Sequence, residues 1–526
     1  MKDRKHAAPV FKPYEQDQML LIPPTAAELI PADHLARVID RAIDGMELEE
    51  LFATYEGGGA SSYSPVMLLK VLIYAYTQKV YSSRQIAKQV RENVVYMWLS
   101  GRNTPDFRTI NNFRSSHLKE CIQDVFAEAV GILVEEGYIG FKAYYLDGTK
   151  IEANANKYSF VWRKATEKYK ARLEAQIRSI LEEADRAMEE ENAVYGDRDL
   201  EELGGNGPIP PEKLKAAIER INEKVRSRLA GHEELKKKIC RDLATVESKD
   251  LPRLERYQKE LGIMEDRKSC SKTDPDATFM GMKEDPMRNH QLKAAYNVQM
   301  GTEDQFIVGY SIHQKPTDTT CLIPHLTAVK KRLGRLPTTI VADAGYGSEE
   351  NYAFLERRRL RAFVKDTMFR REKERSFAKQ VYRKENMPYD EERDRFTCPA
   401  GRHLTFHHEQ HTKSANGHPA TVRIYEGHRC GGCDHRAACC SGQGNRRIQV
   451  NRNYERLRAR ARQRLESPEG LYHRSRRPVD VESVWGQIKQ NRGFRRFMLR
   501  GIDKVEAEWG LVVLAHNMIK MRQAMA

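Results

Sequence analysis

The stretch Val481-Glu482-Ser483-Val484-Trp485-Gly486-Gln487-Ile488-Lys489 combines an apolar pattern with one acidic and one basic residue. Its apolar residues follow the i, i+3, i+4, i+7 spacing of a helix with one buried face. Glu482 and Lys489 are about two helical turns apart, so they point the same way. Arginines follow at 492, 495 and 496. A carboxylate beside cations, on a helix held by its own core face, suits a metal site next to a polyanion, although a solvated surface helix has the same pattern.

Composition favours a nucleic-acid partner. The 526 residues include 89 Lys and Arg against 74 Asp and Glu, a formal net charge of +15, although a basic but otherwise ordinary protein is also compatible. Mean hydropathy is −0.70, and neither a long apolar run nor the apolar core of a signal peptide is present. Nine cysteines without a secretory signal indicate a reducing compartment. We expect a cytoplasmic, nucleoid-associated protein with no membrane contact.

Residues 1–135 read as an all-helical domain. Helix starts are predicted at Ser64-Pro65, at Ser82 or Ser83, and at Thr104-Pro105-Asp106. Short helices joined by tight turns fit a helix-turn-helix DNA reader, with a plain helical bundle as the alternative. Four basic residues would be available to DNA: Arg84, Lys88, Arg108 and Arg114.

A mixed α/β sheet is predicted downstream, with two insertions. One strand, 143–146, ends at Asp147, and another, 338–342, ends at Asp343. Further strands are predicted at 294–300 and 305–313, around a turn at 301–304, and at 362–365, with a helix at 323–333. The predicted domains are 136–159 with 263–365 for the first part of the core, a hairpin of two long helices at 160–262, an irregular Cys/His-rich insertion at 366–450, and a basic segment with closing helices at 451–526.

Asp147 and Asp343 each follow a strand, at the sheet edge where functional side chains gather. Together with Glu482 they would repel one another, and a divalent cation removes that conflict. Two Mg²⁺ ions about 4 Å apart could activate a water or a 3′-hydroxyl at a phosphodiester. Taken singly, Asp147-Gly148 also suits a type I′ turn and Asp343 could simply end a strand. The order strand-Asp, strand-Asp, helix-Glu favours the site.

At this point the chain resembles a prokaryotic insertion-sequence transposase of the DDE class, in the eleven-eighty-two group related to the insertion-sequence-four and -five types. The resemblance implies an RNase H-like catalytic core and a homodimer on paired DNA ends. The motifs that carry it are Tyr145–Ala153, Ser271–Ala277, Val341–Tyr346, Val481–Lys489, Gly493–Phe497, Leu499-Arg500-Gly501 and Ala515–Lys520.

The resemblance also implies residue roles. Asp147, Asp343 and Glu482 are the expected catalytic ligands of Mg²⁺ or Mn²⁺. Pro478 stands where related enzymes have an arginine, so Arg477 or Arg476 is expected to replace it. The residues expected to contact DNA are Lys489, Arg492, Arg495, Arg496, Arg477 and Arg476.

Two further acids remain open in the sequence. Asp480 is a rival to Glu482, which is preferred because of the motif and because it shares a stripe with Lys489. Asp318 also matches an acidic position of the group. A helix N-cap is favoured for Asp318 over a partner of the metal site.

A cysteine cluster follows the second aspartate. Cys398, Cys430, Cys433 and Cys439 have the spacing C-x31-C-x2-C-x5-C, which offers four soft ligands for a tetrahedral structural Zn²⁺. Cys440 competes with Cys439, and reduced cysteines in a loop-rich insertion are the alternative. Other candidate ligands are His403, His428 and His435.

The sequence therefore predicts a DNA transposase that binds the terminal repeats of its element and catalyses metal-dependent cleavage and strand transfer into target DNA. The arginine run at 452–464 would supply salt-dependent phosphate contacts. Alternatives are a domesticated or inactive transposase acting as a sequence-specific DNA-binding protein, and an RNase H-like nuclease without strand transfer. A coiled-coil scaffold would rest on 160–262 alone.

Overall fold

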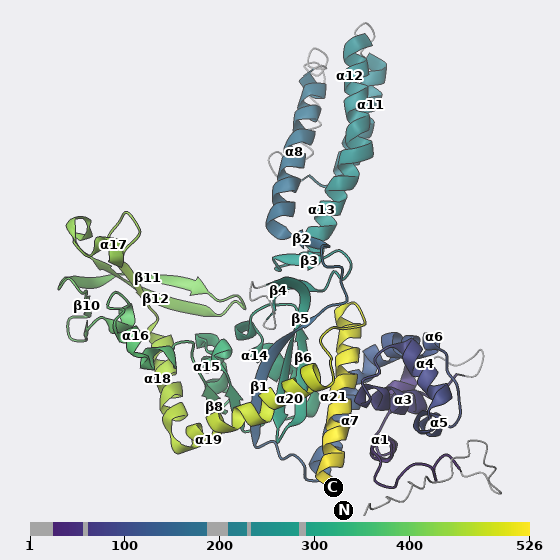
Figure 1. The fold of residues 1–526 in the computed structure, drawn as a ribbon. Coiled ribbons are helices and arrows are strands. Elements are labelled where there is room, and N and C mark those ends of the chain that lie inside the picture. The colour runs from purple at the N-terminus through teal and green to yellow at the C-terminus, as the bar shows by residue number, and fades with distance from the viewer. Residues whose placement is uncertain (1–24, 56–61, 187–208, 229–232, 283–290, 526) are drawn as a thin grey trace, which may run out of the picture.

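The computed structural model describes residues 25–55, 62–186, 209–228, 233–282 and 291–525 (Figure 1). Its centre is a mixed sheet in which β5 pairs with β1, β1 with β7 and β7 with β8, while β4 and β6 both pair with β5. β1, β5 and β6 are antiparallel neighbours, and β1, β7 and β8 are parallel neighbours. The strands are β1 (Ala143–Glu152), β4 (Thr278–Gly281), β5 (Leu292–Glu303), β6 (Phe306–His313), β7 (Thr339–Ala342) and β8 (Arg361–Val364).

Strand β1 is longer than predicted. The antiparallel ladder with β5 continues through Asp147↔Met300 as far as Glu152, whereas the parallel pairing with β7 stops at Leu146↔Ala342. The prediction that the strand ends before Asp147 is therefore wrong, and so is the alternative of a type I′ turn. Asp147 lies within β1, one residue beyond its last pair with β7 and beside Asp343.

The β5–β6 turn also lies later than predicted. Glu303 pairs with Phe306, so the turn residues are Asp304 and Gln305, not 301–304. Both have positive φ, 51° and 68°, as a two-residue type I′ hairpin turn requires. Gly301 instead lies within β5 against the ring of Tyr144, where an added Cβ would come within 1.7 Å of the ring.

The described N-terminal residues form helices, and their predicted starts are confirmed. Ser64 caps α3 by accepting from the Met67 amide, and Asp106 caps α6 by accepting from the Thr109 amide. α4 begins at Ser83. The helices are α1 (Leu35–Asp44), α2 (Glu49–Ala53), α3 (Pro65–Thr77), α4 (Ser83–Glu92), α5 (Val94–Leu99), α6 (Phe107–Asn112), η1 (Phe113–His117) and α7 (Leu118–Glu135).

Arg114 is not available to DNA, which corrects the sequence prediction. Its guanidinium is buried and donates to the Tyr76 hydroxyl, the Tyr81 carbonyl and the Ser83 hydroxyl. Arg84, Lys88 and Arg108 are exposed.

The N-terminal helices share one continuous apolar core with the sheet and the C-terminal helix α21 (Ile502–Met525). α21 runs beside α7 (Figure 1). Its buried Glu508 accepts from the backbone amides of Met498 and Leu499, which fixes the chain that leads into the helix. The N-terminal and C-terminal segments are therefore built into the same body as the sheet.

The 160–262 insertion is a helical arm that projects from the sheet (Figure 1). The prediction of two long helices is wrong, because the described residues form three helical stretches around their own apolar core. The segments between α8 and α11 and between α11 and α12 lie outside the described residues. The arm consists of α8 (Arg163–Arg186), α11 (Pro211–Arg228), α12 (Glu233–Thr245), η2 (Val246–Asp250) and α13 (Leu251–Met264), on a base of β2 (Phe160–Trp162) paired with β3 (Ser269–Ser271).

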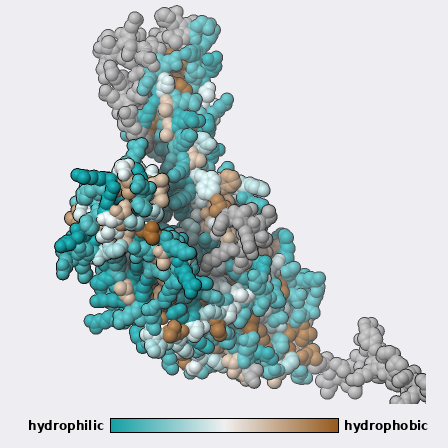
Figure 2. Space-filling model, turned by 60° about the vertical axis from the view of Figure 1, so that its left-hand side comes forward, coloured by the Kyte–Doolittle hydropathy of each residue, from teal (hydrophilic) through white to brown (hydrophobic). Residues whose placement is uncertain are grey.

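The prediction that the insertion at 366–450 is irregular is wrong, because it contains a five-stranded antiparallel sheet. The sequence did not predict this sheet because β11 is mostly exposed and polar, without the apolar alternation of a typical strand. Backbone pairing and a small apolar core stabilise the sheet. Its strands are β9 (Tyr389–Asp390), β10 (Arg395–Thr397), β11 (His403–Lys413), β12 (Pro419–Gly427) and β13 (Arg447–Val450). Figure 2 shows a mainly hydrophilic face on this side of the molecule.

Short and long helices complete the fold. Those beside the central sheet are η3 (Asp318–Thr320), α14 (Leu322–Leu333), η4 (Ala344–Tyr346) and α15 (Glu349–Arg357), followed by η5 (Arg371–Lys373), α16 (Arg375–Ala378), η6 (Lys384–Asn386), η7 (Cys430–Gly432) and α17 (Arg436–Cys439). The C-terminal segment continues through α18 (Arg452–Glu466), α19 (Pro468–Arg477), η8 (Pro478–Glu482), α20 (Ser483–Gly486) and η9 (Gln487–Asn491) to α21. None of the described helices has the length and apolar character needed to span a membrane.

Helix α18 carries the arginine run, and most of its charges are already paired. Arg462 forms two 2.8 Å hydrogen bonds with Asp366, and Arg456 and Arg460 pair with Glu356. The salt-dependent phosphate contacts expected of the run stay a prediction. These arginines dock α18 onto its neighbours, because α15 and the segment after β8 supply the acids.

We expect Gly301→Ala to lower the urea midpoint of unfolding, with a loss of about 1–3 kcal/mol or more from overpacking. The added methyl group would overlap the fully buried Tyr144 ring. Gly131→Ala in α7, where a Cβ meets nothing within 4 Å, is the matched control and should gain roughly 0.5–1 kcal/mol. Equal midpoints for Gly301→Ala and the wild type would contradict the packing described here.

Candidate active site

The three predicted catalytic carboxylates meet at one guanidinium. Nη2 of Arg477 lies 2.8 Å from Oδ1 of Asp147 and 3.9 Å from Oδ2 of Asp343, and Nη1 bonds Glu482. The Arg477 side chain is 9% exposed, whereas that of Glu482 is 48% exposed. β1, the end of β7 and η8 thus bring together residues that are far apart in the sequence.

A π-helical turn explains why Arg477 fills the arginine position. In η8 the Ser483 amide bonds the Pro478 carbonyl, five residues back. This i→i+5 geometry places Arg477 on the face of Glu482, although an α-helix would place Pro478 there. Pro478 is tolerated because it stands at the first position of the turn. Of the two candidates, the structure therefore turns Arg477 toward the acids.

Asp343 is fixed by the turn that follows β7. It caps η4 by accepting a 2.9 Å hydrogen bond from the Gly345 amide, and Thr319 donates to the Gly345 carbonyl. The backbone after β7 is thereby tied to the chain around Asp318.

Asp318 is a fourth carboxylate at this place, and the favoured N-cap role is wrong. The residue that precedes α14 is Cys321, and Asp318 instead accepts from Asn297 at 2.9 Å and Gln299 at 3.0 Å. Its Oδ1 lies 2.6 Å from the point where a Cβ at Gly148 would stand, and its Oδ2 lies 3.4 Å from that of Gly345. Asp318 thus fits against the strand that carries Asp147 because its neighbour there, Gly148, is a glycine, whereas the distance at Gly345 is an ordinary contact.

Tyr346 is a buried tyrosine next to the acids. Its hydroxyl is fully buried and donates to Gln299. Burial raises its pKa well above the usual value, and the charges of Asp318, Asp147 and Asp343 raise it further. The phenol therefore stays protonated and acts as a hydrogen-bond donor beside the acids.

Lys365 is a cation near the site that sequence reasoning did not single out. Burial and the charges of Arg477 and Arg474 lower its pKa, while Asp343 and Glu482 oppose this shift. The available signal was positional. Lys365 directly follows β8, as Asp343 directly follows the parallel neighbour β7, so both lie at the same sheet edge.

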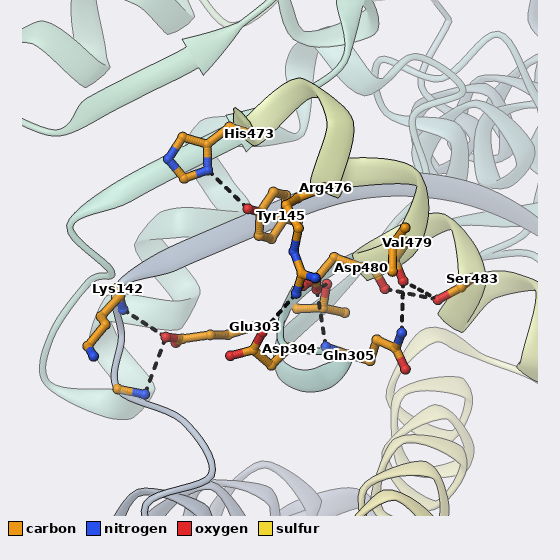
Figure 3. A network of polar contacts seen from close by, with 12 residues as sticks. Lys142, Tyr145, Glu303, Asp304, Gln305, His473, Arg476, Val479, Asp480 and Ser483 are labelled. Carbon is orange, nitrogen blue, oxygen red and sulfur yellow. Dashed lines mark hydrogen bonds and ion pairs between the residues drawn. The ribbon is translucent and has the colours of Figure 1, made fainter. Parts of the chain in front are cut away.

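Asp480, the rival to Glu482, points elsewhere (Figure 3). It is fully buried and accepts from the Thr302 hydroxyl at 2.6 Å and the Gln305 amide at 3.2 Å, and burial raises its pKa. Arg476 lies beside it and bonds Asp304 at 3.0 Å. This network attaches η8 to the β5–β6 turn, which favours Glu482 as the site residue.

The other residues expected to contact DNA differ in exposure. Lys489 is 6% exposed and donates to Thr149 at 2.7 Å, and the buried Arg492 bonds His516 at 2.7 Å. Burial lowers the pKa of Arg492 to about 10. Arg495 and Arg496 are exposed. As placed here, Lys489 and Arg492 face the interior, and the DNA contacts of all six residues stay predictions.

The five clustered cysteines line one pocket, and every cysteine is a free thiol. Burial raises the pKa of Cys439, and its neighbours Cys398, Cys440 and Cys430 raise it further. All three candidate histidines have other partners, since His403 bonds Thr397, His428 bonds Thr405 and His435 bonds Tyr382. Across the described residues, no three His, Cys, Asp or Glu side chains are already arranged to hold a metal ion.

Two comparisons with known families match the two ends of the chain. Residues 397–522 match the Transposase DDE domain, a span that includes the thiol pocket, Arg477, Glu482 and α21 but neither Asp147 nor Asp343. Residues 24–116 match a Transposase domain (DUF772). No curated protein matches the chain. A DDE domain implies an enzyme of the nucleotidyl-transferase type with DNA substrates. Together the two matches show a transposase of the DDE type.

Proposed function

We propose that this chain binds the ends of its own insertion sequence, of the eleven-eighty-two group, cleaves the DNA there and transfers the freed end into target DNA. The observation that carries the proposal is the meeting of Asp147, Asp343 and Glu482 at one guanidinium. Three acids from separate elements that converge at one sheet edge repel one another, which lowers the stability of the folded protein. Folding by itself therefore gives no reason to bring them together. A catalytic role accounts for them.

The proposed core is RNase H-like. Three antiparallel strands followed by two parallel ones, in the order β6, β5, β1, β7 and β8, support this proposal. The acids occupy the middle of β1, the end of β7 and the closing helical segment.

The carboxylates suit Mg²⁺ or Mn²⁺ by their chemistry. All offer hard oxygen donors, and a positive group already lies among them. When bound, two such ions would activate the attacking water or 3′-hydroxyl and stabilise the leaving oxygen. Asp147, Asp343 and Glu482 would hold the ions, Asp318 and Tyr346 would keep the aspartates in place, and Lys365 would lie next to the DNA phosphate.

DNA binding is proposed for the exposed cations. Arg84, Lys88 and Arg108 lie on the N-terminal helices, and Arg495 and Arg496 follow the Glu482 segment. Such contacts would make affinity fall steeply with salt. We propose a homodimer on paired ends, as for the related enzymes.

A structural Zn²⁺ is proposed for the pocket of Cys398, Cys430, Cys433 and either Cys439 or Cys440. Soft thiolates around one small pocket are the donor set that zinc prefers. The ion would staple the loops that follow β10 and β12, which have only a small apolar core.

A second candidate is a transposase that binds DNA without chemistry. The guanidinium among the acids favours it, since an arginine can hold the cluster together without any metal. An RNase H-like nuclease differs from the proposal only in lacking joined products.

We expect Asp343→Asn to lower Mg²⁺-dependent cleavage of DNA carrying the element's ends by at least about a hundredfold, beyond the loss typical of an outer-shell partner. A neutral amide is a poor Mg²⁺ ligand, whereas DNA binding should be unchanged because the fold keeps its shape. Cleaved and joined products on gels and a mobility-shift titration measure the two effects.

Asp33→Asn, whose side chain is 79% exposed, is the control for that assay. Full cleavage by Asp343→Asn would remove this residue from the active site. Specific binding without cleavage by the wild type would favour the non-catalytic candidate, and cleavage without joining would favour the nuclease.

We expect purified protein to contain about one Zn²⁺ per chain and the double variant Cys430→Ser/Cys433→Ser to contain almost none. Elemental analysis by mass spectrometry measures the content. Cys240→Ser, a cysteine of α12 in the arm, should keep its zinc. Zinc-free wild type, or a double variant that retains the metal, would overturn the assignment.

A further inference from the structure

The position of Arg477 points to a role that neither the fold nor the family matches assign. A residue that only contacts DNA would be expected at the surface. Arg477 instead is 9% exposed and spends both terminal nitrogens on the three acids. Its Nε atom is buried without a hydrogen-bond partner. The side chain is therefore positioned to neutralise the carboxylates, although this leaves one buried donor without a partner.

The guanidinium lies where a metal ion would have to bind. It touches one oxygen each of Asp147, Asp343 and Glu482. A second cation, Lys365, is close enough to act on Asp343 and Glu482. A divalent ion bound at the same oxygens would be repelled by the positive guanidinium.

We propose that Arg477 is an internal counter-ion, which holds the three carboxylates together in the metal-free protein and must leave them when the divalent ions bind. This inference rests on the proposed metal-dependent function and adds a positioning residue to it. The π-helical turn η8 is what places Arg477 on the same face as Glu482. Once displaced, the guanidinium would be free for the DNA contact predicted for it.

The test compares Mn²⁺ binding to the full chain without DNA, by titration calorimetry, in the wild type and in Arg477→Gln. The amide keeps a hydrogen-bond donor but removes the competing charge. We expect Arg477→Gln to bind Mn²⁺ at least about tenfold more tightly, equivalent to about 1.4 kcal/mol. Its melting temperature without metal should be lower than that of the wild type, and Mn²⁺ should raise it by more.

Two further variants separate charge from position. Arg477→Lys keeps the charge and should bind Mn²⁺ much as the wild type does. If Arg477→Gln does not fold, Arg477→Met, which also removes the charge from a long side chain, takes its place in the comparison. Arg522→Gln changes a partly exposed arginine of α21 that pairs with Asp33, and should leave Mn²⁺ affinity unchanged.

Equal or weaker Mn²⁺ binding by Arg477→Gln would overturn the inference, since the guanidinium would then not compete with the metal. Absence of binding in every variant would overturn both the inference and the metal site. The Mn²⁺ titration does not measure cleavage, so the two proposals can fail separately. A wild type that binds Mn²⁺ but does not cut DNA in the cleavage assay would contradict the proposed function alone. Tighter binding by Arg477→Gln would then still support the counter-ion.

Discussion

The register of the parallel pair β1 and β7 is the constraint on which the site depends. Leu146 pairs with Ala342, so the next residues, Asp147 and Asp343, emerge side by side where β7 has ended. The antiparallel ladder with β5 continues past this point and keeps Asp147 in an extended conformation. A shift of one residue in either pairing would turn one aspartate to the other face of the sheet.

The C-terminal helices supply both a third acid and the arginine that offsets the negative charge of the two aspartates. η8 supplies Glu482, which adds to the negative charge, and the last residue of α19, Arg477, offsets it. The same segment is anchored twice, by Asp480 on the β5–β6 turn and by Arg492 against His516 of α21. The Tyr81 hydroxyl donates to the Arg492 carbonyl, so the N-terminal helices also hold this segment. The site therefore depends on both ends of the chain.

Net charge alone misjudges which cations serve a partner. Arg462 and Arg114 belong to the basic excess, but both are bound to groups of the protein itself. A buried arginine must find acceptors, and these partners come from segments distant in sequence. Arg495 and Arg496, which follow the Glu482 segment, are exposed.

The sequence by itself predicted the mixed α/β sheet and the helix starts, because periodicity and caps are local, and the order of its motifs singled out the three acids that meet at Arg477. Ser64 and Asp106 cap their helices as predicted, and Asp343 follows β7 as predicted. Only the tertiary structure decided that Arg477 faces the acids. That position depends on a π turn, which leaves no pattern in a 3.6-residue period. Asp318, Lys365 and the polar sheet β9–β13 were likewise decided by pairing across the fold, since neighbours in space, not in sequence, place them.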